Sequence, residues 1–264
     1  MVSIENDLSL NIYSAKFRNL DPAIGRWWQI DPKVEEYTGW SVYHAMANNP
    51  VRVADPNGDR WLRPADQQQG EKLIRKIDSK ITKLAAKTEK YEGKMNRARE
   101  AGKVDKAQKF QAKIASNNER VGEMTTSRTQ IQAMGNHAAT FAFEKVQGNI
   151  GSTRIEARRD NNRNVLVIVI GHTGSVGNQI HEARHASDIA DHRVQTVLGR
   201  ITQEDLEPTE VSAYRAEYAY TSKVVDSLAG PVNNINDING RYVGGIMNND
   251  GTPLYPSIFG NYRY

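Results

Sequence analysis

The residues best suited to chemistry lie in the stretch His181-Glu182-Ala183-Arg184-His185, which has the pattern His-Glu-x-x-His. Residues four apart in a helix share one face, so both imidazoles can bind the same ion. Glu182 follows the first histidine and can take a proton from a metal-bound water. Two ligands and a general base in this order indicate zinc-dependent peptide hydrolysis. The alternative is a polar helix whose histidines are solvated or hydrogen-bonded in the core.

A third protein ligand is expected, because catalytic zinc keeps three protein ligands and one water. Glu210 is the preferred candidate: it lies 25 residues after His185, and its Glu-x-x-Ala context resembles the glutamate-ligand (gluzincin) class. The metzincin pattern would instead place the ligand ten residues after the first histidine, at Asp191. That pattern has a glycine where this chain has Asp188, and His192 is one position off it.

The face that carries Glu210 offers further candidates. Ala213, Tyr214 and Glu217 follow it at i+3, i+4 and i+7, which places all four on one side of a helix. We expect Glu217 to accept the remaining N–H of a ligand histidine, with Asp188 competing for this role. Glu210 and Glu217 could also exchange roles. The candidates for stabilising the oxyanion are Tyr214, Tyr218 and His172.

Strands and helices must position these side chains. Residues 152–157 and 164–170 are rich in β-forming residues, and residues 158–163 between them indicate a hairpin with a longer loop. The run 165–170 is apolar throughout, which predicts a strand buried on both faces, beside whose edge a peptide could bind. Ser175 is expected to cap a helix over 176–191, and the next helix is expected to begin near Pro208 and end before Gly230.

A pair of helices is predicted before this region. Apolar residues recur at helical spacing from Leu73 to Ala85, and again from Phe110 to Met134 at intervals close to 3.5. Residues 101–103 break the pattern, and Asp105 is a plausible N-cap. We therefore expect an antiparallel hairpin that serves as a scaffold or spacer. The alternative is a receptor-binding or membrane-active arm, although the narrow lysine-rich stripes argue against membrane insertion.

Composition limits the remaining possibilities. The 264 residues contain no cysteine, which leaves histidine, aspartate and glutamate as the strong metal ligands. The net charge of +4 is mild, and the basic residues are interleaved with acidic ones, which favours a solvated helical surface over a nucleic-acid groove. The sequence has no apolar run long enough for a membrane span and no visible signal peptide. Any export is therefore expected to use a machine that does not read such a peptide.

The N-terminal segment is rich in aromatic residues and in turn-forming dipeptides. Short strands are expected over 11–17 and 26–30, separated by Asp-Pro, Asn-Pro and Asn-Gly turns. Its tryptophans need a larger apolar surface than about fifty residues can offer. This segment therefore reads as the end of a larger β-rich structure.

Residues 8–59 resemble the C-terminal end of the Rhs repeat-associated core of polymorphic toxins. The motifs that carry the resemblance are Arg18 with Asp21-Pro22, Ile24-Gly25-Arg26-Trp27, Asp31-Pro32, Asn48-Asn49-Pro50 and Asp55-Pro56-x-Gly58. In that family a β-shell encloses a variable C-terminal toxin, which aspartyl-type autoproteolysis releases just after the Asp-Pro-x-Gly element. The resemblance associates Arg18, Asp31 and Asp55 with the cleavage.

Two observations bear on this cleavage. The residue after the glycine is Asp59, where the family usually has leucine. Arg18 and Asp31 could also form a simple ion pair between strands.

The C-terminal region, with His-Glu-x-x-His-Ala followed by Glu-x-x-Ala-Tyr, looks like the metallopeptidase toxin domains found behind Rhs cores. The resulting expectation is an α+β fold in three parts: an Rhs-core remnant (1–59), a helical hairpin (60–135) and a zincin-like domain (136–264). Its His181, His185 and Glu210 would bind Zn²⁺.

The resemblance also implies a secreted effector that acts in a target cell. A contractile or type VI-like system would deliver it, a target-cell protein would be its substrate, and an immunity protein would be a partner. Neither nucleic-acid binding nor membrane insertion is expected. The alternatives are a secretion cargo or structural protein with a non-catalytic metal site, and a metal-dependent nuclease toxin.

Overall fold

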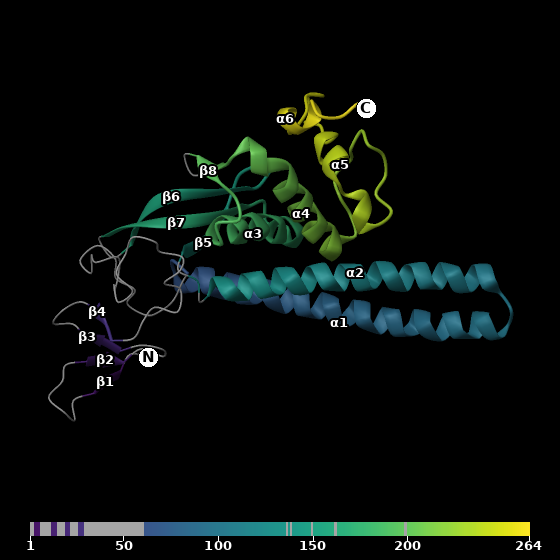
Figure 1. The fold of residues 1–264 in the computed structure, drawn as a ribbon, viewed down its shortest axis with the longest axis horizontal. Coiled ribbons are helices and arrows are strands. Elements are labelled where there is room, and N and C mark those ends of the chain that lie inside the picture. Colours follow the sequence, from purple (N-terminus) through teal and green to yellow (C-terminus); the bar gives the residue numbers. More distant parts are fainter. Residues whose placement is uncertain are drawn as a thin grey trace. The chain divides into compact units, whose positions relative to one another are not determined.

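A computed structural model describes two compact units of the chain, Met1–Asp59 and Arg60–Tyr264. The described residues are 3–5, 12–14, 19–21, 26–28, 61–135, 137, 139–148, 150–160, 163–197 and 200–264. The fold is α+β, because the described residues form both helices and small sheets (Figure 1). The boundary between the units coincides with the expected end of the N-terminal segment, whereas no such division separates 60–135 from 136–264.

The first unit contains a four-stranded antiparallel sheet in sequential order. The strands expected over 11–17 and 26–30 correspond to the shorter β2 and β4. Arg18, Asp31 and Asp55, the residues associated with autocleavage, lie outside the described residues. The strands are β1 (Ser3–Glu5), β2 (Ile12–Ser14), β3 (Asn19–Asp21) and β4 (Arg26–Trp27).

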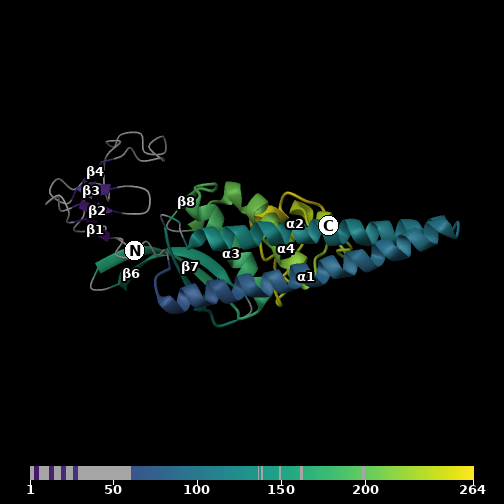
Figure 2. The same ribbon diagram turned by 90° about the horizontal axis from the view of Figure 1, so that it is seen from below.

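The predicted helical hairpin is present and opens the second unit. Helices α1 (Pro64–Glu100) and α2 (Val104–Met134) lie side by side, joined at residues 101–103, where Gly102 has a φ of +67°. Figures 1 and 2 show this end projecting beyond the rest of the unit. The expectation that Asp105 caps α2 was wrong. Helix α2 begins at Val104 with Lys103 as its N-cap. Asp105 therefore lies in the first turn, where its negative charge interacts favourably with the helix dipole.

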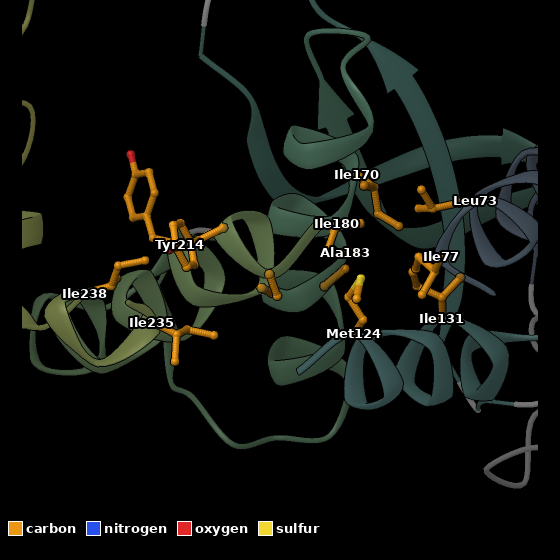
Figure 3. Close-up of a cluster of buried hydrophobic side chains, with 14 of the residues drawn as sticks. Leu73, Ile77, Met124, Ile131, Ile170, Ile180, Ala183, Tyr214, Ile235 and Ile238 are labelled. Carbon is orange, nitrogen blue, oxygen red and sulfur yellow. The ribbon is translucent and has the colours of Figure 1, made fainter. Parts of the chain in front are cut away.

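The half of the hairpin nearer the sheet packs against the helix that carries the histidines. Side chains of α1 and α2, including Ile77 and Met124, share one buried cluster with Ile180 and Ala183 (Figure 3). Arg184 adds a polar link to α2, because its Nη2 donates to Glu123 at 2.9 Å and to Ser127 at 3.1 Å. The hairpin therefore supplies part of the core beneath the candidate site.

The sheet of this unit has three strands, in the order β5 (Thr140–Lys145), β7 (Arg163–His172) and β6 (Ser152–Asp160). The central strand β7 runs parallel to β5 and antiparallel to β6. Strand β5 was not predicted. The predicted hairpin between β6 and β7 is present, but the prediction of a longer loop was wrong, because residues 158–160 pair with 163–165 and leave two residues between the strands. Burial of the whole run 165–170 was also wrong: residues 167–170 are buried, but Leu166 is 72% exposed.

The two edges of this sheet differ. Beside β5, Leu62 donates its backbone N–H to Phe141, and Asp66 accepts the backbone N–H of Phe143. These bonds satisfy edge groups of β5 that would otherwise be open to another strand. Strand β6 forms the other edge. Since β7 is paired on both sides, no further strand can add directly beside it, so the expectation that a peptide could bind along the edge of the apolar strand was wrong.

Two helices follow the sheet. Helix α3 (Val176–Ala190) confirms the prediction, with Ser175 accepting the N–H of Asn178 as its cap. Strands β8 (Thr196–Val197) and β9 (Arg200–Ile201) then lead to α4 (Gln203–Thr221). Helix α4 begins five residues before the predicted start, so Pro208 lies inside it rather than at its first turn. It ends, as expected, well before Gly230.

The C-terminal residues form short elements against α4: η3 (Ile235–Asp237), α5 (Gly240–Gly244) and α6 (Pro256–Phe259). Ile235, Ile238 and Ile258 are buried in the same cluster as Tyr214. None of the described helices has the length and the apolar run that crossing a membrane would need.

If the hairpin and the histidine helix share one core, damage at their contact should destabilise both together. We predict that Met124→Ala, at a position that is 0% exposed, lowers the free energy of unfolding by about 2–5 kcal/mol. The control is Val104→Ala, at a 63% exposed position, which should have little effect. Chemical denaturation followed by far-UV and near-UV circular dichroism measures both. A loss confined to a separate hairpin transition would contradict the shared core.

Candidate metal centre

Two histidines of α3 and one glutamate of α4 meet in the interior between these helices. His181 and His185 point their Nε2 atoms at each other across 3.2 Å. Glu210 reaches both: its Oε2 lies 3.4 Å from His181 Nε2, and its Oε1 lies 3.5 Å from His185 Nε2. In the described part of the chain, this is the group of three or more histidine or acidic side chains whose ligand atoms could hold a metal ion. The structure thus brings together the three predicted ligands.

The contacts between the imidazole nitrogens and the Glu210 carboxylate are close in length to the ligand–ligand distances of a zinc site. For an ion about 2.0–2.1 Å from each ligand atom, tetrahedral geometry separates the ligand atoms by about 3.3–3.4 Å. The two Nε2 atoms are 3.2 Å apart, and Glu210 approaches each imidazole with a different oxygen, Oε2 at 3.4 Å from His181 and Oε1 at 3.5 Å from His185, so each of these contacts is close to that value. Nitrogen and carboxylate oxygen are ligands that zinc accepts, and three protein ligands leave the fourth position for water.

The charges around these atoms also favour a cation. His181, His185 and Glu210 are 5–8% exposed. Burial disfavours a charge on His181, but the carboxylates of Glu210 and Glu217 outweigh it and raise the pKa of His181 to about 10. Burial likewise opposes the charged form of Glu210, but His185 and His181 outweigh it and lower its pKa. The buried carboxylates thus favour positive charge at this place, whether it is carried by a proton on His181 or by a bound cation.

Glu182 lies on the side of α3 that faces strand β6. Thr153 of β6 donates its hydroxyl to Glu182 Oε2 at 2.9 Å and lies equally close to the Glu182 carbonyl. Gly151 leaves room for this carboxylate, because a Cβ there would overlap with Glu182 Oε1 and lie 2.8 Å from Asn178 Oδ1. Burial raises the pKa of Glu182, against the opposing effect of both histidines. A raised pKa suits a group that must accept and return a proton.

Glu217 occupies the position expected for a supporting group. Its Oε2 lies 3.3 Å from His181 Nδ1, the nitrogen that faces away from the cluster. Gly177 allows this approach of the two helices, since a Cβ there would lie 2.6 Å from Thr221 Cγ2 and 3.1 Å from Glu217 Oε1. The competing candidate, Asp188, instead pairs with Arg193 at 3.3 Å. The geometry therefore places Glu210 in the cluster and Glu217 behind it.

The metzincin alternative finds no support in the geometry. Asp191 follows the end of α3, is exposed, and pairs with Arg193 at 2.9 Å and with His137 at 3.4 Å. His192 is also exposed and has a φ of 53°. Neither belongs to the group of ligand atoms.

Two tyrosines approach the cluster, and only one of them was a candidate. The ring of Tyr214 packs edge-on against His181, and its hydroxyl lies 3.2 Å from that of Tyr255. Tyr255 donates to Glu210 Oε2 at 2.9 Å. Sequence reasoning missed Tyr255, because it lies 45 residues after Glu210 in a segment without a recognisable period.

The remaining oxyanion candidates lie elsewhere. Tyr218 donates to the carbonyl of Asn233, and His172 packs edge-on against Phe143. Burial lowers the pKa of His172, and Lys145 lowers it further. Neither residue contacts the metal-ligand group among the described interactions.

Comparisons of the chain with protein-family models, curated proteins and solved structures found no match.

The geometry makes a direct prediction about metal binding. Wild-type protein reconstituted with zinc should carry about one ion per chain, and His185→Ala should lose it, because two remaining ligands hold zinc poorly. Asp191→Ala is the matched control and should retain the ion. Elemental mass spectrometry after desalting measures the ratio. Loss of zinc in Asp191→Ala with retention in His185→Ala would contradict the assignment.

Proposed function

We propose that the chain is a zinc-dependent peptidase. The observation that carries the proposal is the buried group of His181, His185 and Glu210, whose ligand atoms all lie within 4.8 Å of one another, with a buried carboxylate from the residue next to His181 on the same helix. His181, His185 and Glu210 would hold the ion, and Glu217 would orient His181. A bound zinc would supply Lewis acidity toward water and the peptide carbonyl.

Glu182 is the general base of this proposal. It takes a proton from the attacking water and passes it to the leaving amine, so the same carboxylate serves both halves of the hydrolysis. Thr153 holds one oxygen of Glu182 and thereby restricts its orientation. Tyr214 remains a candidate for donating a hydrogen bond to the oxyanion, and the hydroxyl of Tyr255 lies beside its own.

The edge strand β6 supports a way to present the substrate. Thr153 belongs to β6 and touches Glu182, so a peptide added alongside β6 would run past the general base. Main-chain hydrogen bonds supply affinity in this mode, and side-chain pockets supply selectivity. An extended segment of a target protein fits such a site better than a folded surface.

The biological setting rests on the resemblance of residues 8–59 to the Rhs core. On this basis the peptidase is a toxin carried as the C-terminal tip of an Rhs-type effector. It is secreted by a contractile or type VI-like machine, acts on a protein of the target cell, and has an immunity protein as its partner.

A second candidate is a protein with a non-catalytic metal site. The specific observation in its favour is the burial of the site, since Glu182 and the three ligands are all 4–8% exposed. Structural zinc sites are closed, but they usually have four protein ligands. Here three ligands form the group, which favours catalysis.

The test of the peptidase is Glu182→Gln. This variant should bind zinc like the wild type but lose turnover by about 10²–10⁴-fold, because a general base contributes that much. The matched control is the exposed Glu204→Gln on α4, which should cleave normally. New protein N-termini in target-cell lysate, measured by mass spectrometry, report cleavage. Unchanged cleavage by Glu182→Gln would overturn the mechanism, and nucleic-acid cleavage that survives in this variant would favour the nuclease.

Gly151 offers an independent test of the same carboxylate. Gly151→Ala should lower turnover without loss of zinc, because the added methyl group overlaps with Glu182 Oε1 and crowds the Gly171 carbonyl and Asn178 Oδ1, none of which is a ligand atom. Gly122→Ala is the control, since a Cβ at that position meets nothing within 4 Å. Activity and zinc content are measured on the same preparations. Full activity in Gly151→Ala would mean that the observed position of the Glu182 carboxylate is not required for turnover.

A further inference from the structure

The C-terminal segment 254–264 contacts the helix that supplies the third ligand. We propose that Tyr255 is a positioning residue that fixes the Glu210 carboxylate for metal binding, and that residues 255–262 of this segment therefore belong to the metal centre. This inference rests on the proposed function, because it assigns a role within the same site.

The contact to Glu210 is specific. The Tyr255 hydroxyl donates to Oε2 at 2.9 Å, and this oxygen is the one that faces His181 Nε2. The other oxygen, Oε1, faces His185. A hydrogen bond to one oxygen of a ligand carboxylate restricts its rotation, and such supporting bonds tune metal affinity. Without the phenol, the carboxylate could turn about its last bond and lose its aim at the two imidazoles.

A second phenol of the segment anchors it to α4, at a residue one turn before Glu210. Tyr262 donates to Glu207 Oε1 at 2.6 Å, and Glu207 and Glu210 lie at i and i+3 on one face. The close fit includes Gly240, where a Cβ would overlap with Glu207 and with Tyr262. Ile258, which is 2% exposed, packs into the core between the two tyrosines.

Helix α4 needs such support at this place. Pro208 lies between the two glutamates and has no N–H, so the helix lacks the hydrogen bond to the carbonyl of Glu204. His181 and His185 share one regular helix and are spaced by it. Glu210 lies on another helix, in a turn that lacks one backbone hydrogen bond. The hydroxyls of Tyr255 and Tyr262 bind to the glutamates on either side of Pro208 in that turn. The position of the third ligand therefore depends on the C-terminal segment.

The test removes single hydroxyl groups. Tyr255→Phe should weaken zinc binding by about 10–100-fold, the usual effect of losing a supporting bond to a ligand. Tyr264→Phe is the matched control: it removes a phenol of the same segment that donates to the Arg241 carbonyl and should leave affinity unchanged. Competition with a chromophoric chelator measures affinity. The visible spectrum of the cobalt-substituted protein reports ligand geometry and should change only in Tyr255→Phe.

Thermal unfolding of the metal-free variants separates positioning from simple stability. Lower affinity with an unchanged metal-free Tm supports the proposal. Unchanged affinity and an unchanged cobalt spectrum in Tyr255→Phe would overturn it, whatever happens to Tm. If Tyr255→Phe does not fold, Tyr262→Phe is the second variant, and it should weaken zinc binding by loosening the same turn of α4. Wild-type protein that binds no zinc would instead overturn the proposed function itself.

Discussion

The structure around α3 and α4 depends on one electrostatic constraint: carboxylates and imidazoles share a buried space that strongly favours positive charge. Glu210 lies against both histidines, Glu217 lies behind His181, and Glu182 adds a third carboxylate nearby. Desolvated carboxylates are costly without a compensating cation. Protonated His181 can meet this need in part, and a divalent ion would meet it more fully, because two imidazoles and a carboxylate converge on one point.

The rest of the second unit keeps this arrangement in place. The hairpin α1–α2 buries its near half against α3 and joins it through Arg184, so it is a support for the histidine helix and not only a spacer. Strand β6 brings Thr153 and Gly151 to Glu182. The C-terminal segment brings Tyr255 to Glu210. The histidine helix, Glu182 and Glu210 are thus each supported by a different part of the chain, and a single compact unit is needed to hold them together.

Sequence alone predicts the parts of this site that lie on regular helices. The spacing of His181 and His185 places them on one face whatever the surroundings, and the helix face that carries Glu210 also points to Glu217. Contacts between distant segments were not predictable in the same way. The need for glycine at position 151 arises only where β6 meets α3, and Tyr255 approaches Glu210 only after the tail folds back.

The fold shows the same limit. The hairpin and α3 follow from local periodicity and a serine cap, whereas β5 depends on parallel pairing with residues of β7 that lie 27 positions later in the chain. The start of α4 was misplaced because proline favours the first turn of a helix, and here Pro208 is tolerated inside.

The most direct measurement for the central claim is a crystal structure of the zinc-loaded protein with data collected at the zinc absorption edge. The account predicts one strong anomalous peak about 2.0–2.2 Å from His181 Nε2, His185 Nε2 and a carboxylate oxygen of Glu210. A peak at other side chains, or no peak between these three in zinc-soaked crystals, would contradict it.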